Sequence, residues 1–531
     1  MKDVPVVIVG GGPFGLTASI LLSQAGIRSL LVERHPGTAN HPKARAINGR
    51  TMEIFRQCGV EAAIRSAGLP LDHTGMIIWA KTLAGEEIER RVPWRASQQA
   101  ATVSPVRNCL CAQDDLEPVL RTFAEQQGTG DLKFSTEAVA FEQEADGVTV
   151  ALEDHGGGEK ESVCATYVIA ADGAQSRIRR KLGTRMIGRA NVYDSVNILF
   201  NADLTAWTAH RPAALYFIEN ERIRGSFLTI NARDRWGFLI SAMGAFGYTA
   251  EDITPEHAVD IIRLAVGVPN LDVKILGIAP WTASACVAEQ YRYGRIFLAG
   301  DAAHEMPPTG GFGMNTGVQD VHNLVWKLAA VLKGQASPSL LDTYHDERQP
   351  VARTITEQSL INATSMGRLE HTKRNVGARP EYLNEQEMIF GATYTSRAIV
   401  SDGTEAPHVS NPVTDYVPSA RPGSRAPHVF VLRDGAQIST IDVVGNGFVL
   451  LTAGDGRMWA EAARELANDH SVPLKTQPID DEAFTSAYDI DASGAVLVRP
   501  DGYVGWRSRS ITRDPSRTLR DAVSMILRTS N

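Results

Sequence analysis

The chain has 531 residues, of which 43% are hydrophobic and 21% charged, and its formal net charge is −8. A chain of this length exceeds what one hydrophobic core organises, so we expect two or three domains. The ordinary composition excludes a disordered, collagen-like or coiled-coil protein, and the acidic balance argues against nucleic acid as a partner.

The predicted elements begin with a βαβ unit over residues 4–33. Period-two alternation over 224–240 indicates half-buried antiparallel strands. Residues 317–332 carry apolar side chains on one helical face, and Gly334 follows as a stop. The patterns also predict helices over 49–58 and near 115–127, strands through 134–150 and over 167–170, β-rich sequence over 192–287, and a strand over 295–299.

Five prolines interrupt every pattern between residues 401 and 428, which indicates a linker. Beyond it, alternating short strands and helices indicate a small α/β unit. This region contains no cysteine, so it cannot carry out dithiol chemistry. We expect strands over 429–432, 447–451, 495–498 and 503–506, and helices over 459–468 and 517–527.

A glycine-rich loop follows the first apolar strand, where residues 10–15 (GGGPFG) fit the spacing Gly-x-Gly-x-x-Gly. In this pattern Gly10 turns tightly, Gly12 lets a pyrophosphate approach the backbone, and Gly15 packs helix against strand. Glu33 ends the second strand, where a carboxylate can accept hydrogen bonds from ribose hydroxyls. The sequence therefore predicts a bound dinucleotide, without deciding between NAD and FAD.

Two further loops follow predicted strands. Residues 171–177 (ADGAQSR) are, taken alone, equally consistent with an Asp-Gly turn that begins a helix. Residues 295–304 (RIFLAGDAAH) continue into 305–315 (EMPPTGGFGMN), so an acid at a strand end precedes a proline- and glycine-rich loop and a helix start. Such an arrangement predicts a site for a polar chain and a ring.

Together these three segments resemble the class A flavoprotein monooxygenases, the family of para-hydroxybenzoate hydroxylase, phenol hydroxylase and the aromatic polyketide hydroxylases. The resemblance covers about residues 1–365, and the region beyond 401 resembles the thioredoxin-like tail of the phenol and polyketide branch. It implies an α/β fold with a Rossmann-like FAD-binding domain, an antiparallel β-sheet substrate domain and a thioredoxin-like C-terminal domain. The implied division is 1–70, 107–185 and 291–400 for FAD binding, 71–106 and 186–290 for the substrate domain, 401–428 for the linker and 429–531 for the C-terminal domain.

The resemblance also implies the cofactor site. Asp301 is expected to hold the ribityl chain of FAD, and the backbone of 310–315 to face the pyrimidine edge of its ring, where a helix N-terminus stabilises negative charge. Arg45 and His304 are candidates for a catalytic role, although the position of His304 is usually structural in this family. The expected cofactor set is Gly10, Gly12, Pro13, Phe14, Gly15, Glu33, Arg34, Arg45, Gln113, Asp172, Gly173, Gly300, Asp301, Pro308, Gly311, Gly313, Met314 and Asn315.

The implied activity is hydroxylation of a small aromatic substrate, phenolic or polyketide-like. NADPH or NADH reduces FAD, O2 adds to form a flavin C4a-hydroperoxide, and its distal oxygen is delivered to an electron-rich ring carbon. The substrate is expected between the flavin and the β-rich region, although core packing is the favoured interpretation for most side chains there. Packing or homodimerisation is the expected role of the C-terminal domain. The substrate candidates are Tyr216, Phe217, Arg224, Phe227, Trp236, Phe238 and Pro307.

Two alternative functions stay open: an FAD-dependent reductase, and a non-catalytic FAD protein that sequesters a labile intermediate. A flavin-dependent halogenase is disfavoured because none of the eight tryptophans stands two residues from another. A disulfide reductase is disfavoured because the chain has no second Gly-x-Gly-x-x-Gly and no redox cysteine pair.

The five cysteines are scattered, without a Cys-x-x-Cys pair or a metal-ligand spacing, so we expect buried free thiols and no metal. The N-terminus lacks the segments of a signal peptide. No uncharged apolar stretch reaches the roughly 18 residues that a bilayer span needs. We therefore expect a cytoplasmic protein without a membrane span.

Overall fold

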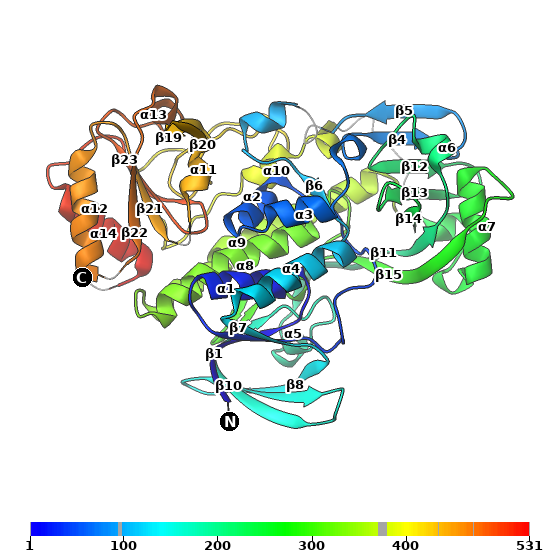
Figure 1. Cartoon of the computed structure of the whole chain (residues 1–531), viewed down its shortest axis with the longest axis horizontal. Coiled ribbons are helices and arrows are strands. Elements are labelled where there is room, and N and C mark those ends of the chain that lie inside the picture. The colour runs from blue at the N-terminus through cyan, green and yellow to red at the C-terminus, as the bar shows by residue number, and fades with distance from the viewer. Residues whose placement is uncertain are drawn as a thin grey trace.

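The computed structural model describes residues 2–93, 98–369, 380–433, 435–445, 447–470 and 472–529. Figure 1 shows a central unit, a second sheet on one side of it and a C-terminal unit on the opposite side. This mixed architecture of helices and separate sheets confirms the expected α/β class. None of the helices in the described ranges combines the length and the hydropathy that a transmembrane span needs.

The central unit is built on a mostly parallel sheet. Its strands are β1 (Lys2–Val9), β2 (Ser29–Val32), β7 (Gly130–Lys133), β8 (Thr136–Gln143), β9 (Val148–Asp154), β10 (Lys160–Ala170), β16 (Arg292–Tyr293) and β17 (Ile296–Leu298). The order is β16-β17-β10-β1-β2-β7, with β8 and β9 attached to β10 as an antiparallel extension. The central residues of β1 are buried on both faces, which explains their uninterrupted apolar sequence.

Helices cover this sheet and carry part of the site. They are α1 (Pro13–Gln24), α2 (Gly49–Gln57), α3 (Glu61–Ala67), α4 (Gln113–Gln127), α5 (Arg177–Lys181), α8 (Gly313–Leu332), α9 (Thr343–Ser365) and α10 (Gln386–Phe390). α1 packs against both α4 and α8. The predicted apolar face of α8 is buried, with Val318, Val321 and Val325 at most 3% exposed. α8 starts at Gly313 rather than at 317, because its first turn forms before the apolar pattern begins.

The second sheet is mainly antiparallel. Its strands are β4 (Ile77–Ala80), β5 (Glu87–Arg91), β11 (Met186–Asn201), β12 (Leu215–Glu219), β13 (Arg224–Thr229), β14 (Arg235–Ile240), β15 (Lys274–Ala288) and β18 (His304–Glu305). The order is β18-β15-β11-β14-β13-β12-β4-β5. The alternation over 224–240 corresponds to the antiparallel pair β13 and β14. Helix α7 (Pro255–Val266) covers one face, and a hydrophobic core lies between them.

The C-terminal unit holds a four-stranded sheet of order β22-β21-β23-β24. Its elements are β19 (Phe430–Arg433), β20 (Ala436–Ser439), α11 (Thr440–Val443), β21 (Phe448–Thr452), α12 (Arg457–His470), β22 (Leu474–Pro478), α13 (Glu482–Tyr488), β23 (Ala495–Val498), β24 (Val504–Ser508) and α14 (Pro515–Leu527). β20, α11, β22 and α13 have no counterpart among the predicted elements. The edge strand β22 was missed because it is polar and lacks an apolar run. Residues 401–428, the predicted linker, form neither helix nor strand.

A first buried ion cluster joins the linker to the central unit. Glu53 of α2 accepts hydrogen bonds from Arg425 Nε at 3.0 Å and from Arg50 Nη1 at 3.0 Å. The side chains of Glu53 and Arg425 are each 1% exposed. Arg50 also donates to the Asp501 carbonyl at 2.6 Å. The cluster therefore connects α2 both to the linker and to the C-terminal sheet.

A second buried cluster lies between α9 and the C-terminal sheet. Glu347 accepts hydrogen bonds from Arg499 Nη1 and Lys327 Nζ, each at 2.7 Å, and Arg499 also pairs with Asp501. All four side chains are at most 1% exposed. We call these two clusters together the C-terminal junction.

Candidate cofactor and substrate site

Three loops meet at the carboxyl edge of the central sheet, because β1, β10 and β17 are parallel neighbours. The first loop starts at Gly10, and the Asp172 and Asp301 loops follow the other two strands. A Cβ atom on Gly10 would clash with the Ala171 carbonyl, and its φ is +113°, so only glycine fits there. The three motifs, far apart in the chain, thus lie side by side at the edge where open parallel sheets bind ligands.

The backbone of the first loop is open at Gly12. A Cβ atom there would meet only Glu117 Oε1, at 3.9 Å. Gly12 directly precedes α1, whose start has no side-chain cap. Uncapped amide groups at a helix start attract an anion. Gly15 has the opposite environment, because a Cβ on it would clash with the Gly10 carbonyl.

Glu33 is held beside the first loop. Its Oε2 accepts a hydrogen bond from Gly11 N at 2.7 Å, and its Oε1 accepts one from His35 N at 2.9 Å. A carboxylate has about four acceptor sites, so Glu33 retains capacity for ribose hydroxyls. Arg34 is exposed next to it.

Glu117 of α4 faces the first loop, although the sequence motifs did not identify it as a site residue. It is 3% exposed and accepts hydrogen bonds from Ala39 N and Gln113 Nε2, each at 2.6 Å. Burial raises its pKa. Gln113, an expected cofactor residue, is thereby tied to Glu117.

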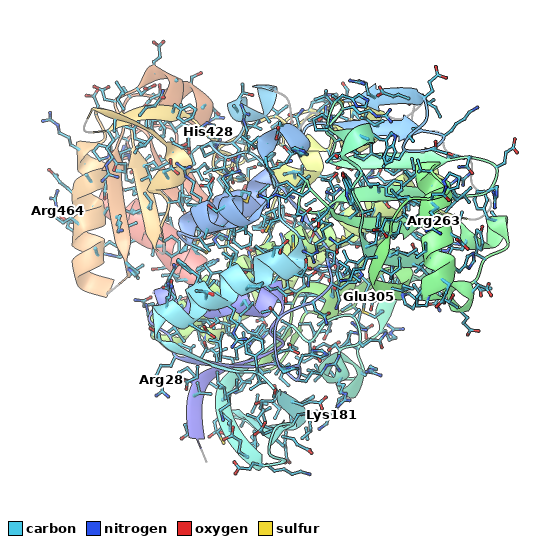
Figure 2. All side chains as sticks on the ribbon, turned by 45° about the vertical axis from the view of Figure 1, so that its right-hand side comes forward. Arg28, Lys181, Arg263, Glu305, His428 and Arg464 are labelled. Carbon is cyan, nitrogen blue, oxygen red and sulfur yellow. The ribbon has the colours of Figure 1, made fainter. Side chains whose placement is uncertain are left out.

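The Asp172 loop is fastened by a second residue that the sequence did not single out. Arg179 of α5 donates to the carbonyls of Asp301, at 3.2 Å, and Ala174, at 2.6 Å. It also pairs at 3.2 Å with Glu305 of β18, which is labelled in Figure 2. Asp172 accepts from Ile178 N at 3.3 Å, its Oδ1 is buried without a hydrogen-bond partner among the described residues, and burial raises its pKa.

Asp301 follows β17 in the short turn Gly300–Ala302. Burial raises its pKa, although the charges of His304 and Lys43 act in the opposite direction. Phe14 fixes this turn: a Cβ on Gly300 would clash with the Phe14 ring, and one on Gly317 would do the same. Phe14 therefore packs the first loop against the third rather than lying in the open part of the site.

His304 lies beneath this turn in a buried ion cluster. Its Nε2 lies 2.8 Å from Asp320 Oδ2, and Arg348 Nε donates to Asp320 Oδ1 at 2.9 Å. All three side chains are 0% exposed. Burial opposes ionisation of Asp320, but His304 and Arg348 hold its pKa below the ordinary value. Gly300 N also donates to Asp320, so the arrangement fits a structural role for His304.

The loop after Asp301 ends at an uncapped helix start. α8 begins at Gly313, and Phe312 before it supplies no side-chain cap. Asn315 links the loop to residues 46–48: its Nδ2 donates to Ala46 O at 2.8 Å and Gly311 O at 2.6 Å, and its Oδ1 accepts from Asn48 N at 2.9 Å. Met314 is 7% exposed and Pro308 is exposed. The free amides of the first turn of α8 thus lie beside the Gly310–Gly311 loop, which the Asn315 side chain holds in place.

A pocket opens at this loop. Its empty volume is about 690 Å³, part of which is open to solvent. Its walls come from the short strands β3 (Ala46–Ile47) and β6 (Cys109–Leu110), the third loop and the segments around Thr74 and Asn108. The lining includes Asn48, Thr74, Arg107, Asn108, Gly310, Gly311, Asn315 and Ile389.

Arg45 joins the cofactor side to the second sheet. It is 9% exposed and donates to the carbonyls of Thr229 at 3.0 Å and Ala214 at 2.6 Å. These contacts give it a position between the two units.

The aromatic substrate candidates divide between the two faces of the second sheet. Tyr216, Phe227, Trp236 and Phe238 are at most 2% exposed and belong to the core under α7. Because side chains alternate along a strand, Phe217 points to the other face, where it stacks on Trp79 with ring centroids 5.3 Å apart. Arg224 pairs with Glu219 at 2.7 Å and donates to Gly367 O at 2.8 Å. Pro307 is buried in the third loop.

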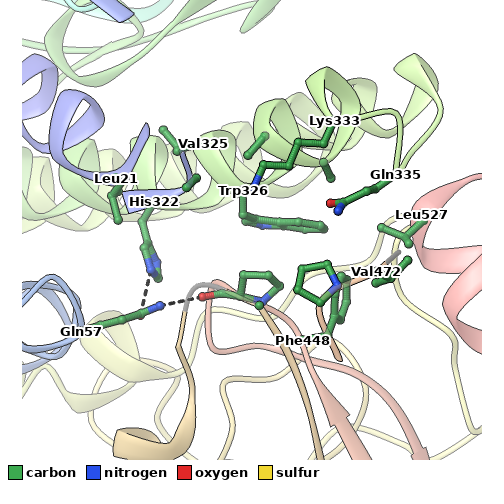
Figure 3. A pocket seen from close by; sticks show the side chains of 16 residues that line it. Leu21, Gln57, His322, Val325, Trp326, Lys333, Gln335, Phe448, Val472 and Leu527 are labelled. Atoms are coloured by element: carbon green, nitrogen blue, oxygen red, sulfur yellow. Dashed lines mark hydrogen bonds between the residues drawn. The ribbon is translucent and has the colours of Figure 1, made fainter. Parts of the chain in front are cut away.

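A different pocket lies at the opposite end of the central unit (Figure 3). There α8 meets the C-terminal sheet, and Trp326 contacts Phe448 with ring centroids 5.7 Å apart. His322 Nε2 lies 3.1 Å from Gln57 Oε1, and Gln57 donates to Pro500 O at 3.0 Å. None of the residues that line it also lines the pocket at the third loop.

Known proteins resemble the chain along nearly its full length. A family model described as an FAD binding domain matches residues 3–359, and one described as the C-terminal part of aromatic-ring hydroxylases matches residues 419–529. A 4-methyl-5-nitrocatechol 5-monooxygenase from Burkholderia sp is 38% identical over 99% of this chain and 98% of its own length. A tetracenomycin B2 monooxygenase-dioxygenase from Streptomyces olivaceus is 38% identical over 99% of each chain. The flavin-dependent monooxygenase PieE, solved with FAD and substrate, is 34% identical, with a TM-score of 0.91 over 99% of each chain.

Proposed function

The chain belongs to the FAD-binding aromatic-ring hydroxylases, and we propose that it uses reduced nicotinamide and O2 to hydroxylate a phenolic or polyketide-like ring. Relatives named as monooxygenases align with it from end to end. The convergence of the three loops beside a pocket is the observation that carries the proposal. The family predicted from the motifs is confirmed.

The residues at the three loops fit an FAD molecule. Gly12 leaves space for a pyrophosphate, and the starts of α1 and α8 offer uncapped amides at two separate points. Asp301 accepts no hydrogen bond from another described residue, so its carboxylate can accept the hydroxyls of the ribityl chain. Glu33 has the same capacity for the ribose.

When bound, FAD supplies the transfer of hydride from nicotinamide and of oxygen to the ring. The protein orients the cofactor and the substrate and encloses them. The start of α8 stabilises negative charge beside the Gly310–Gly311 turn, because the helix dipole is positive there. The second sheet closes the site on the side of Arg45, which keeps water from the reacting ring.

The division into domains forms part of the proposal: FAD binding by 1–70, 107–185 and 291–400, substrate binding by 71–106 and 186–290, and a thioredoxin-like unit at 429–531 after the linker. We place the substrate on the face of the second sheet opposite α7. Tyr216, Phe227, Trp236 and Phe238 are not carried into this wall, because they lie in the core of the other face. A cytoplasmic location and a homodimer also belong to the proposal.

The test uses purified protein with its flavin. We expect a yellow protein whose NAD(P)H oxidation is accelerated by phenols or hydroxylated polycyclic aromatics, with one atom of ¹⁸O from ¹⁸O2 in the product. A flavin reductase would oxidise NAD(P)H without placing ¹⁸O in the product. A protein that only sequesters an intermediate would show neither NAD(P)H oxidation nor ¹⁸O incorporation. A colourless protein that takes up no flavin overturns the proposal.

A further inference from the structure

The buried pair of Asp320 and Arg348 contacts two elements that are expected to face the flavin. Asp320 Oδ2 accepts a hydrogen bond from Gly300 N at 3.2 Å, in the turn that carries Asp301. Arg348 Nη2 donates to Thr316 O at 3.2 Å, in the first turn of α8. The two side chains are joined at 2.9 Å and are 0% exposed. The pair therefore holds the Asp301 turn and the start of α8 together.

A third contact of Arg348 leads toward the C-terminal unit. Its Nη1 donates to the Tyr394 hydroxyl at 3.1 Å, in the segment between α10 and the linker. The Tyr394 ring stacks on the Tyr503 ring, with centroids 4.0 Å apart. Tyr503 directly precedes β24, and the two tyrosines are 2% and 3% exposed. One guanidinium thus contacts the cofactor side of the central unit and, through a stacked pair of rings, the C-terminal sheet.

The position of Tyr394 is fixed by the linker and the C-terminal unit. Its backbone N donates to Gly423 O at 2.8 Å, and Gly423 N donates to Val504 O of β24 at 2.8 Å. A Cβ atom on Gly423 would clash with the Tyr394 carbonyl, so the two backbones lie in close contact. The guanidinium of Arg499, which belongs to the C-terminal junction, lies 5.5 Å from the centre of the Tyr394 ring. The hydroxyl that meets Arg348 is therefore held from the C-terminal side.

The shape of the guanidinium allows Arg348 to transmit this position. A guanidinium is a planar fork whose five donors have fixed directions, so it fixes its three acceptors relative to one another. A displacement of the Tyr394 hydroxyl therefore tilts the plane that also holds Asp320 and Thr316 O. Cofactor sites depend on such supporting contacts at the level of fractions of an ångström. The contacts thus connect the C-terminal sheet to the elements around the flavin.

We propose that Arg348 is a positioning residue for the flavin, through which the C-terminal unit fixes the Asp301 turn and the start of α8. This inference rests on the proposed FAD site and gives the C-terminal unit a part in cofactor binding. Reduced flavin depends on Arg348 more strongly than oxidised flavin, because the positive end of the α8 dipole stabilises its negative charge.

The test compares the FAD-loaded protein with Tyr394→Phe, which removes only the hydroxyl that meets Arg348. The control, Tyr488→Phe, removes a buried hydroxyl of α13 that donates to Pro427 O at 2.8 Å. A third variant, Tyr503→Leu, removes the stacked ring on the C-terminal side. Unfolding midpoints of the flavin-free proteins measure stability, titration with FAD measures affinity, and redox titration of the bound flavin measures its midpoint potential.

We expect Tyr394→Phe to bind oxidised FAD about tenfold more weakly than the unchanged protein, which is the contribution of about one hydrogen bond. The affinity for reduced flavin should fall about tenfold further, which lowers the two-electron midpoint potential by about 30 mV. Tyr503→Leu should change both quantities in the same direction. Tyr488→Phe should lower the unfolding midpoint and leave FAD affinity and potential as in the unchanged protein.

Unchanged FAD affinity and potential in Tyr394→Phe overturn the inference, and so does a loss of affinity that Tyr488→Phe shares. Weaker FAD binding in Tyr394→Phe with none in a folded Tyr503→Leu also contradicts it, because the C-terminal unit then takes no part. An unchanged protein that takes up no flavin contradicts both the inference and the proposed function. The expected variant effects in a yellow protein that yields no ¹⁸O-labelled product leave the inference standing and remove the proposed hydroxylation.

Discussion

The central unit meets its two neighbours through junctions of opposite character. Toward the second sheet, the buried hydroxyls of Tyr193 and Thr309 have no hydrogen-bond partner in the described chain other than each other. In the C-terminal junction each charged side chain has an ion-pair partner, at most 5% exposed in every case. Unsatisfied polar atoms are costly unless a ligand completes them, whereas a complete ion cluster holds two surfaces together. This contrast supports the proposal that a ligand binds at the first junction, whereas the paired charges hold the second junction together.

The largest expected effect comes from breaking the closed junction. Glu347→Gln leaves Arg499 and Lys327 without their shared carboxylate, and removing one partner of a buried pair costs about 3–5 kcal/mol. We expect a lower unfolding midpoint of the FAD-loaded protein, followed by tryptophan fluorescence in urea.

Its control lies on the same helix. Glu357→Gln removes an exposed pair with Arg353, whose side chains are 69% and 66% exposed, and such pairs contribute about 0–1 kcal/mol. Equal shifts of the unfolding midpoint for the two variants would show that the buried Glu347 cluster contributes no more stability than an exposed ion pair.

The next prediction separates FAD binding from the stability of the fold. Asp301→Ala removes the carboxylate expected to accept the ribityl hydroxyls, so FAD affinity should fall about a hundredfold, or about 2.7 kcal/mol. The flavin-free variant should unfold no more easily than the flavin-free parent, because it loses a half-buried carboxylate that accepts no hydrogen bond from another described residue. The flavin absorbance per protein and the two midpoints measure this, and a variant that purifies fully yellow contradicts the assignment.

A smaller, gradual change in the unfolding midpoint is expected as the pH is lowered. Burial opposes ionisation of Glu53, but Arg425 and Arg50 hold its pKa below the ordinary value of 4.5. A carboxylate with a lowered pKa stabilises the fold above that value and loses its contribution as pH falls below it, by at most about 1.4 kcal/mol per pH unit. The unfolding midpoint should therefore drop below pH 4.5, and the drop should be shallower in Glu53→Gln. Parallel pH curves for the two proteins would assign the acid sensitivity to other groups.

The sequence predicted the features that depend on neighbouring residues along the chain. The loops at Gly10, Asp172 and Asp301 were found because each is a short motif after an apolar strand, and β23 matches its expected range. Arg179 and Asp320 were missed, because each acts through contacts made more than fifteen residues away. Period-two alternation located β13 and β14 but could not decide which face meets the cofactor, because their aromatic side chains lie on one face and the sequence does not show that α7 covers that face.

The Phe14 ring fills the space that glycine leaves at positions 300 and 317. An early residue of the chain thus finds its packing partners only after some three hundred more have been added. During synthesis, which runs from the N-terminus, the nucleotide-binding fold stays incomplete until the ribosome has passed α8. A truncated product that ends before this helix would expose the Phe14 ring and the apolar surface that α8 covers, and is a natural target for chaperones or proteases.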